Sequence, residues 1–155
     1  MFSVQKNVVG RMMPKRKVSK MTGTVYILRG VPGCGKSTLA KHLAGETGKV
    51  CEADNYFVGD DGVYRYDSNK ISLAHAWCRA IFAEALDAKT SVIVISNTNT
   101  EPLHFFPYED MAKRAGYEVF HLIVENRHGG TNSHGVPDGT LVSMEARIRN
   151  NIKLR

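Results

Sequence analysis

Short apolar runs and amphipathic stretches alternate along the chain from residue 22 onward. The apolar runs predict strands at 24–29, 49–53, 91–96 and 118–124. Apolar positions at helical spacing predict helices at about 36–44, 69–88, 107–115 and from residue 138 onward. The run Val92–Ile95 is apolar at every position, as in a strand that is buried on both faces of a parallel sheet. Strands that alternate with helices predict a three-layer α/β fold with about four parallel strands.

Charge is distributed unevenly over the 155 residues. The net charge of +6 would suit a nucleic-acid-binding protein, yet residues 1–20 carry six bases and no acid, while residues 21–155 carry 15 of each. We therefore expect a flexible basic arm over 1–21 and one folded domain over 22–155. The arm is compatible with a nucleic-acid contact, a transit-like segment or a solvated tail. Met21 directly precedes the first strand and is a candidate start residue.

Composition excludes several protein classes. Hydrophobic residues at 43% and charged residues at 23% are ordinary for a globular domain. The apolar runs are far shorter than the roughly 20 residues that cross a bilayer, so we expect that this chain is not a membrane protein. The three cysteines are too far apart for a CxxC pair, and their odd number argues against a disulfide framework. We expect a reducing compartment, the cytoplasm.

The segment Gly30–Thr38 carries the most specific chemical signal in the sequence. It reads GVPGCGKST, which satisfies the pattern GxxxxGKS/T, and it lies directly between a predicted strand and a predicted helix. That context is typical of a phosphate-binding loop rather than of a glycine-rich turn. The backbone N–H groups of such a loop surround phosphate oxygens, and the N-terminus of the next helix adds partial positive charge. The sequence therefore predicts binding of ATP or GTP together with Mg²⁺.

The positions of this loop have different expected roles. Nucleotide contacts are expected from Gly30, Pro32, Gly33, Cys34, Gly35, Lys36, Ser37 and Thr38. Lys36 is expected to reach the β- and γ-phosphates and to act in catalysis, and the Ser37 hydroxyl is expected to ligate Mg²⁺. Cys34 is either a small space-filling residue or a thiol that can be oxidised.

Polar residues follow three predicted strands, at the edge where ligands of open parallel sheets gather. Asp54 is the candidate general base, because phosphoryl transfer to an alcohol needs a carboxylate that orients the hydroxyl and accepts its proton. Asn97 and Asn99 are candidates for orienting phosphate, water or substrate. Arg127, in the loop after the fourth strand, is the candidate catalytic cation that closes over the triphosphate.

Simpler structural roles stay open for the same residues. Asp54 is also compatible with an Asx-turn or a helix cap, and Asn97 and Asn99 with plain turns. Arg127 is also compatible with a solvated loop arginine. His75 lies beside apolar positions of the long helix, and we expect a partly buried core histidine.

Five segments in a fixed order carry a family resemblance: GVPGCGKST, ADNYF, AHAWC, SNTNT and HGVP. Over roughly residues 22–148 the chain resembles the polynucleotide kinase-like branch of P-loop kinases, which includes the 5′-hydroxyl polynucleotide kinase domain of bacteriophage RNA-repair enzymes. The resemblance implies an ATP- and Mg²⁺-dependent transfer of the γ-phosphate to a 5′-hydroxyl of RNA or DNA, in the cytoplasm of a bacterium or a phage-infected cell. It implies that Asp54 is the general base and that the Asn97-Thr98-Asn99 segment lies beside it.

Two positions depart from the pattern of that family. Thr131 stands where family lids usually carry an arginine that grips the phosphates, so Arg127 would have to replace it. Phe57 stands where the phage enzyme has an arginine that engages substrate phosphate. Two alternatives therefore stay open: a kinase for a nucleoside or another small alcohol, and a nucleotide-binding regulatory module without catalysis. The sequence leaves the acceptor, the choice between ATP and GTP, and the oligomeric state unassigned.

Overall fold

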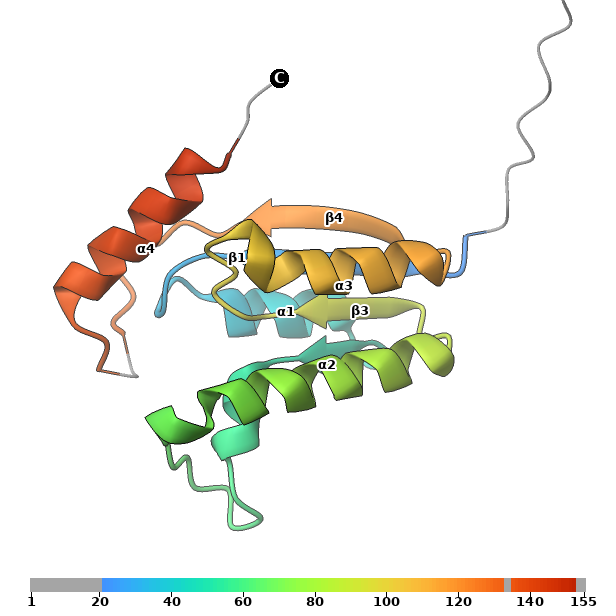
Figure 1. The fold of residues 1–155 in the computed structure, drawn as a ribbon, viewed down its shortest axis with the longest axis horizontal. Coiled ribbons are helices and arrows are strands. Elements are labelled where there is room, and N and C mark those ends of the chain that lie inside the picture. Colours follow the sequence, from blue (N-terminus) through green and yellow to red (C-terminus); the bar gives the residue numbers. More distant parts are fainter. Residues whose placement is uncertain (1–20, 133–134, 153–155) are drawn as a thin grey trace, which may run out of the picture.

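The computed structural model describes residues 21–132 and 135–152, which are built around a parallel sheet (Figure 1). In chain order its strands are β1 (Thr24–Arg29), β2 (Lys49–Cys51), β3 (Val92–Ile95) and β4 (Glu118–Ile123). They lie side by side in the order β2-β3-β1-β4, and every pairing is parallel. All their carboxyl ends therefore meet at one edge. Of the basic arm expected over 1–21, only Met21 lies within the described residues.

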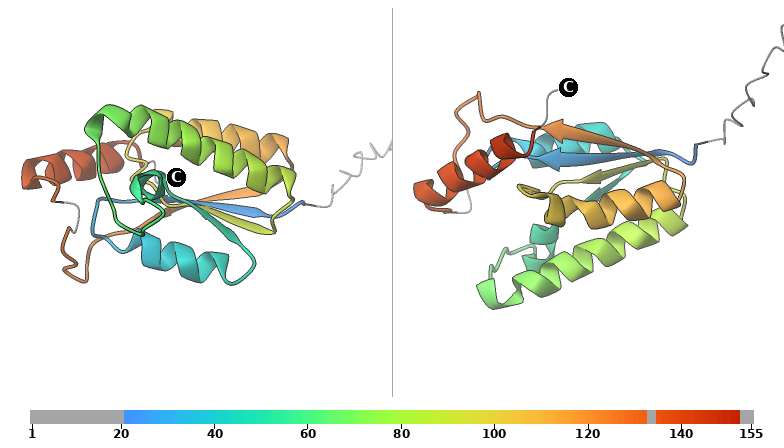
Figure 2. Two further views of the ribbon diagram at one scale, coloured as in Figure 1. Left: turned by 90° about the horizontal axis from the view of Figure 1, so that it is seen from below. Right: turned by 45° about the horizontal axis from the view of Figure 1, so that its top comes forward.

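Helices cover both faces of this sheet. The helix α1 (Lys36–Ala44) lies on one face, whereas α2 (Ile71–Asp87) and α3 (Pro102–Arg114) lie on the other (Figure 2). The helix α4 (Asp138–Asn150) lies at the end of the molecule to which the strand arrows point (Figure 1). The predicted three-layer α/β fold is confirmed. Within the ranges that the structure describes, no helix is both long and apolar enough to cross a membrane.

Side chains that alternate along the strands divide the core into two clusters. Ile93 and Ile95 of β3 belong to the larger cluster, which lies under α2 and α3. Val94, between them, points the other way and packs with Ala40 of α1. Ile93, Val94 and Ile95 are completely buried. The strand is thus covered on both faces, as its unbroken apolar run predicts.

The start of α3 differs from the sequence-based prediction. The helix begins at Pro102, five residues before the predicted start, and Pro107 lies inside it. Glu101 and His104 form a capping box, in which the Glu101 backbone N–H donates to His104 Nδ1 at 3.4 Å. Pro102 then occupies the first turn, where a missing N–H costs nothing. The prediction was wrong because Pro107 was taken as the helix start.

The end of β2 also differs from the prediction. The strand ends at Cys51 rather than at residue 53, and Ala53–Phe57 forms a short 3₁₀ helix. The Ala53 N–H donates to the side-chain oxygen of Asn97 at 2.8 Å instead of to a strand neighbour. Asn97, just beyond the carboxyl end of β3, therefore determines where β2 ends. No local pattern in residues 49–53 could indicate this.

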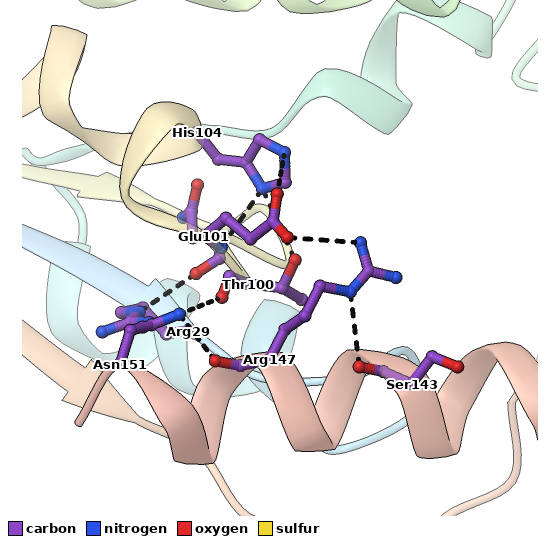
Figure 3. A network of polar contacts seen from close by, with 8 residues as sticks. Arg29, Thr100, Glu101, His104, Ser143, Arg147 and Asn151 are labelled. Atoms are coloured by element: carbon purple, nitrogen blue, oxygen red, sulfur yellow. Dashed lines mark hydrogen bonds and ion pairs between the residues drawn. The ribbon is translucent and has the colours of Figure 1, made fainter.

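A buried arginine ties α4 to the sheet (Figure 3). Arg29, the last residue of β1, donates through Nε to the Asn99 carbonyl oxygen at 3.0 Å, and its guanidinium lies 4.5 Å from the centre of the Phe105 ring. Arg29 Nη2 donates to Asn151 Oδ1. The Asn151 Nδ2 group in turn donates to the Thr100 carbonyl oxygen at 2.9 Å. Burial lowers the pKa of Arg29 from its ordinary value. These contacts hold the end of α4 against the carboxyl edge of the sheet.

We expect Asn151→Ala to lower the free energy of unfolding by about 1–3 kcal/mol, because it removes the hydrogen bonds that Asn151 makes with Arg29 Nη2 and with the Thr100 carbonyl oxygen at a partly buried position. Urea denaturation followed by circular dichroism measures the change. The matched control is Asn150→Ala, at the exposed neighbouring position, which should change stability by less than about 0.5 kcal/mol. Equal effects of the two variants would contradict the anchoring role of Asn151.

Candidate active site

The loop Gly30–Thr38 connects β1 to α1 and has the backbone geometry that a phosphate cradle needs. Gly33 and Gly35 have φ angles of 82° and 92°, a left-handed region that favours glycine. A Cβ at Gly30 would lie 2.6 Å from the Val124 carbonyl oxygen, so only glycine fits there. The loop therefore fits a nucleotide phosphate chain at the N-terminus of α1, as the sequence predicts.

Lys36 is the first residue of α1, and its side chain is buried. Its ammonium group donates to the Val31 carbonyl oxygen at 2.8 Å and lies 3.7 Å from Cys34 Sγ. The positive charge is thus held within the loop itself, where the phosphates of a nucleotide would bind. Cys34 is buried beneath it, which favours the space-filling role over exposure to oxidants.

Ser37 contacts a carboxylate that sequence reasoning missed. Its hydroxyl donates to Glu52 Oε1 at 2.8 Å, and Glu52 directly follows β2. Mg²⁺ prefers oxygen ligands and, in nucleotide sites, binds one or two protein groups plus phosphates and water. The Ser37 and Glu52 oxygens fit that requirement, although no cluster of three or more metal-binding side chains occurs among residues 21–132 and 135–152. The position of Glu52 directly after a strand was the signal that could have indicated it.

Asp54 lies on the 3₁₀ helix Ala53–Phe57, at the same edge of the sheet. The Asn97 side chain holds this helix by accepting from Ala53 N–H, and Asn97 Nδ2 donates to Cys78 Sγ at 3.6 Å. Asn97 is buried, so its amide positions the segment that carries Asp54. Glu52, which contacts the phosphate loop through Ser37, directly precedes the helix that carries Asp54.

Asn99 also holds backbone at this edge. Its side chain donates to the Leu28 carbonyl oxygen at 2.7 Å, and its φ angle of 45° is in the left-handed region that asparagine tolerates. Only 1% of its surface is exposed. Both asparagines named as candidate substrate-binding residues thus contact protein groups, and their contact with substrate stays a prediction.

His75 of α2 lies within electrostatic reach of Asp54. Burial is the main cause that lowers the pKa of His75, and the charges of Arg79 and His104 lower it further. The Asp54 carboxylate opposes them by raising that pKa. His75 is half-buried, and the lowered pKa favours its uncharged form. The expectation of a partly buried core histidine agrees with this placement.

The segment 125–132, which we call the lid, lies against the phosphate loop. A Cβ at Gly33 would lie 2.9 Å from the Thr131 carbonyl oxygen, and a Cβ at Gly35 would lie 3.4 Å from His128 Cε1. The Arg127 side chain instead is 85% exposed and forms an ion pair with Glu125 at 2.5 Å. His128, to which sequence reasoning gave no role, is therefore nearer to the phosphate loop than Arg127 is in this arrangement.

The sequence of this domain matches a known family. The family model described as an AAA domain, AAA_33, matches residues 25–129, well over half of the chain. The chain belongs to this AAA domain family. The matched residues include the phosphate loop, Asp54 and the first part of the lid. Human NEDD4-binding protein 2 is 32% identical over 120 residues, which are 76% of this chain and 7% of that protein. This AAA domain therefore spans less than a tenth of the length of that curated relative.

Solved structures share the fold of this AAA domain. A chain of the Pnkp1/Rnl/Hen1 RNA repair complex superposes with a TM-score of 0.55 at 18% identity, over 90% of this chain and 42% of that one. A sugar kinase from Janibacter sp. HTCC2649 superposes with a TM-score of 0.51 at 20% identity, over 86% of this chain and 80% of that one. At these identities the likeness shows the fold alone. The AAA domain thus shares the parallel α/β fold of these two proteins.

Proposed function

We propose that this chain is an ATP- and Mg²⁺-dependent kinase that transfers the γ-phosphoryl group to a 5′-hydroxyl of a polynucleotide or a nucleotide fragment. One observation carries the proposal: the Ser37 hydroxyl of the phosphate loop, which also holds Lys36, contacts Glu52, and Glu52 directly precedes the 3₁₀ helix that carries Asp54. The fold likeness to a chain of an RNA repair complex supports a nucleic-acid acceptor.

Each residue of this edge has a role in the proposed reaction. The loop amides and Lys36 bind the phosphates, and Asp54 orients the acceptor hydroxyl. The acceptor oxygen bonds to the γ-phosphorus, the bond from that phosphorus to the bridging oxygen of ADP breaks, and the hydroxyl proton passes to the Asp54 carboxylate. The Ser37 hydroxyl, with Glu52 beside it, would hold Mg²⁺, which would supply positive charge to the β- and γ-phosphates.

The lid closes the phosphate side of the proposed site. Asn126 fixes its turn by exchanging two hydrogen bonds of 3.0 Å with the backbone of Gly130. That turn brings His128 beside Gly35, where an imidazole N–H can donate to a phosphate oxygen. Arg127 can reach the triphosphate only by leaving Glu125. We therefore assign the nearer lid contact to His128, with the Arg127 guanidinium as a second candidate.

A small-molecule kinase is the second candidate, and the acidity of the proposed acceptor side favours it. Residues 52–67 carry five carboxylates and one arginine, which is unfavourable for a long polyanion. The fold likeness to a sugar kinase fits this alternative. All three cysteines are buried and unpaired, which fits the proposed reducing, cytoplasmic compartment under either function.

Transfer of label from γ-labelled ATP tests the proposal. The purified full chain is incubated with Mg²⁺ and either a 5′-hydroxyl oligonucleotide, a nucleoside or a hexose. We expect label on the 5′ end of the oligonucleotide. Label on the nucleoside or the hexose alone would establish the small-molecule kinase instead, and ATP binding without any transfer would support a regulatory module.

A further inference from the structure

A cluster of aromatic rings lies beside Asp54, outside the machinery assigned above. Residues 57–67, which we call the aromatic hairpin, fold back on themselves after the 3₁₀ helix. Val58 and Tyr64 form an antiparallel bridge, and the Arg65 N–H donates to the Phe57 carbonyl oxygen at 2.8 Å. A turn closed by Gly62 N–H donating to the Gly59 carbonyl oxygen at 2.8 Å connects the two sides. Backbone hydrogen bonds therefore hold the hairpin in a defined conformation.

Two tyrosines of the hairpin lie on one side of it and contact the same ring. The rings of Tyr64 and Tyr66 both pack against Phe57, so the two side chains point to the same side. Their ring centres lie 6.1 and 5.2 Å from that of Phe57, both in edge-to-face geometry. Phe57 is buried, whereas Tyr64 is 38% and Tyr66 57% exposed. The buried phenylalanine thus supports two rings that are open to solvent.

These rings belong to the same site as the proposed base. Asp54 and Phe57 are three residues apart in a 3₁₀ helix, a spacing that places side chains on the same side. Burial is the main cause that raises the pKa of Tyr64, and the charges of Asp54 and Glu52 raise it further. The Tyr64 hydroxyl therefore lies within electrostatic reach of both carboxylates. A molecule on the tyrosines would extend toward Asp54.

The charges around the hairpin indicate which kind of ligand can bind to the two tyrosines. Its acids outnumber its bases, and Arg65 is engaged by Asp61 in an ion pair of 2.5 Å. Lys70, just beyond the hairpin, pairs with Asp67 at 3.5 Å. A chain of phosphates would meet carboxylates here, whereas a planar, uncharged ring would meet aromatic faces. The occupant that fits is the base of the acceptor's first nucleoside, which carries no 5′-phosphate.

We propose that Tyr64 and Tyr66 form the acceptor-binding surface and that the nucleobase of the 5′-terminal nucleoside stacks on them, with its 5′-hydroxyl directed to Asp54. The inference rests on the proposed kinase function. It adds that recognition is confined to the terminal nucleoside, so that one or two nucleotides suffice and phosphates further along the acceptor contribute little. Acceptor binding then depends weakly on salt.

Binding of a 5′-hydroxyl dinucleotide tests this surface without requiring turnover. Isothermal titration is done on the full chain, with Mg²⁺ and a non-hydrolysable ATP analogue present. Stacking on an aromatic side chain is worth about 5- to 100-fold in affinity, so Tyr66→Ala should weaken binding by that factor. Tyr66→Phe should stay within about twofold of the wild type. The matched control is Phe106→Ala, because Phe106 of α3 is also 57% exposed, and it should leave binding unchanged.

Two further measurements sharpen the same test. A dinucleotide that lacks the 5′-terminal base should bind weakly, and Tyr66→Ala should weaken it no further. A 20-nucleotide acceptor should bind about as tightly as the dinucleotide, and raising salt from 50 to 200 mM should weaken it only about threefold, as for a single phosphate contact. Six or more phosphate contacts would instead cost about a thousandfold or more over that range.

The possible failures are distinguishable. Equal binding by the wild type and Tyr66→Ala, no dinucleotide binding at all, or a strong dependence on acceptor length and salt would each overturn the aromatic surface. Tyr66-dependent dinucleotide binding without label transfer would support the surface and overturn the kinase function. Retention of the wild-type circular dichroism spectrum by Tyr66→Ala, expected for an exposed side chain, shows that the loss is local.

Discussion

Lys36→Ala is expected to abolish phosphoryl transfer and to weaken binding of the nucleoside triphosphate. The Lys36 ammonium is held inside the phosphate loop by the Val31 carbonyl oxygen, so its charge acts on the β- and γ-phosphates in a largely buried setting. Removal of one such fixed donor costs about 10²- to 10³-fold in rate, and loss of a charge-assisted hydrogen bond also weakens binding. Label transfer and titration with ATP measure the two losses.

The control for this variant is Lys41→Ala in the same helix. Lys41 lies in the last turn of α1 and is exposed, so its removal changes the total charge equally but leaves the phosphate loop intact. It should retain transfer and ATP binding. If both lysine variants lost activity to the same extent, general electrostatic attraction rather than the loop would explain nucleotide binding.

Asp54→Ala is expected to reduce transfer by about 10²- to 10⁴-fold while ATP binding stays within a few-fold of the wild type. The two losses should separate because Asp54 is the proposed base on the 3₁₀ helix, whereas Lys36 and the loop amides are the proposed phosphate ligands. Asp54→Asn should lose a similar factor, because the amide keeps the shape of the carboxylate but cannot accept the hydroxyl proton. Label transfer at saturating ATP measures both variants.

Asp60→Ala is the matched control for Asp54. Asp60 is an exposed acid of the aromatic hairpin, only six residues away, and its loss should leave the rate of transfer nearly unchanged. Wild-type activity in Asp54→Ala would contradict the assignment of the base. Loss of ATP binding together with transfer would show instead that Asp54 supports the nucleotide site.

The phosphate loop and the order of strands and helices could be predicted because their signals are local. The glycines, Lys36 and Ser37 lie in nine consecutive residues, and the backbone angles that the loop needs are favoured by glycine itself. The unbroken run of β3 likewise indicated burial on both faces. The end of β2 was predicted wrongly because Asn97, far away in the sequence, binds the backbone there. The start of α3 was predicted wrongly although its signal is local, because Pro107 was taken as the start instead of the capping box of Glu101 and His104.

Much of the site depends on which strands are neighbours. Because β3 lies between β2 and β1, Asn97 reaches the segment that carries Asp54, and Asn99 reaches the end of β1. Ser37 and Glu52 are fifteen residues apart and form a pair only through the fold. None of these contacts leaves a periodic pattern in the sequence.

The sequence by itself determined the parallel α/β architecture, the phosphate loop with Lys36 and Ser37, and the candidate base Asp54, because periodicity and backbone preference act over a few neighbouring residues. Only the tertiary structure decided that Glu52 contacts Ser37, that the two asparagines bind backbone groups, and that Tyr64 and Tyr66 pack around Phe57 near Asp54. It also decided that His128 lies on the phosphate loop while Arg127 turns outward to Glu125. Contacts between side chains far apart in sequence form only when the sheet brings their elements to a common edge.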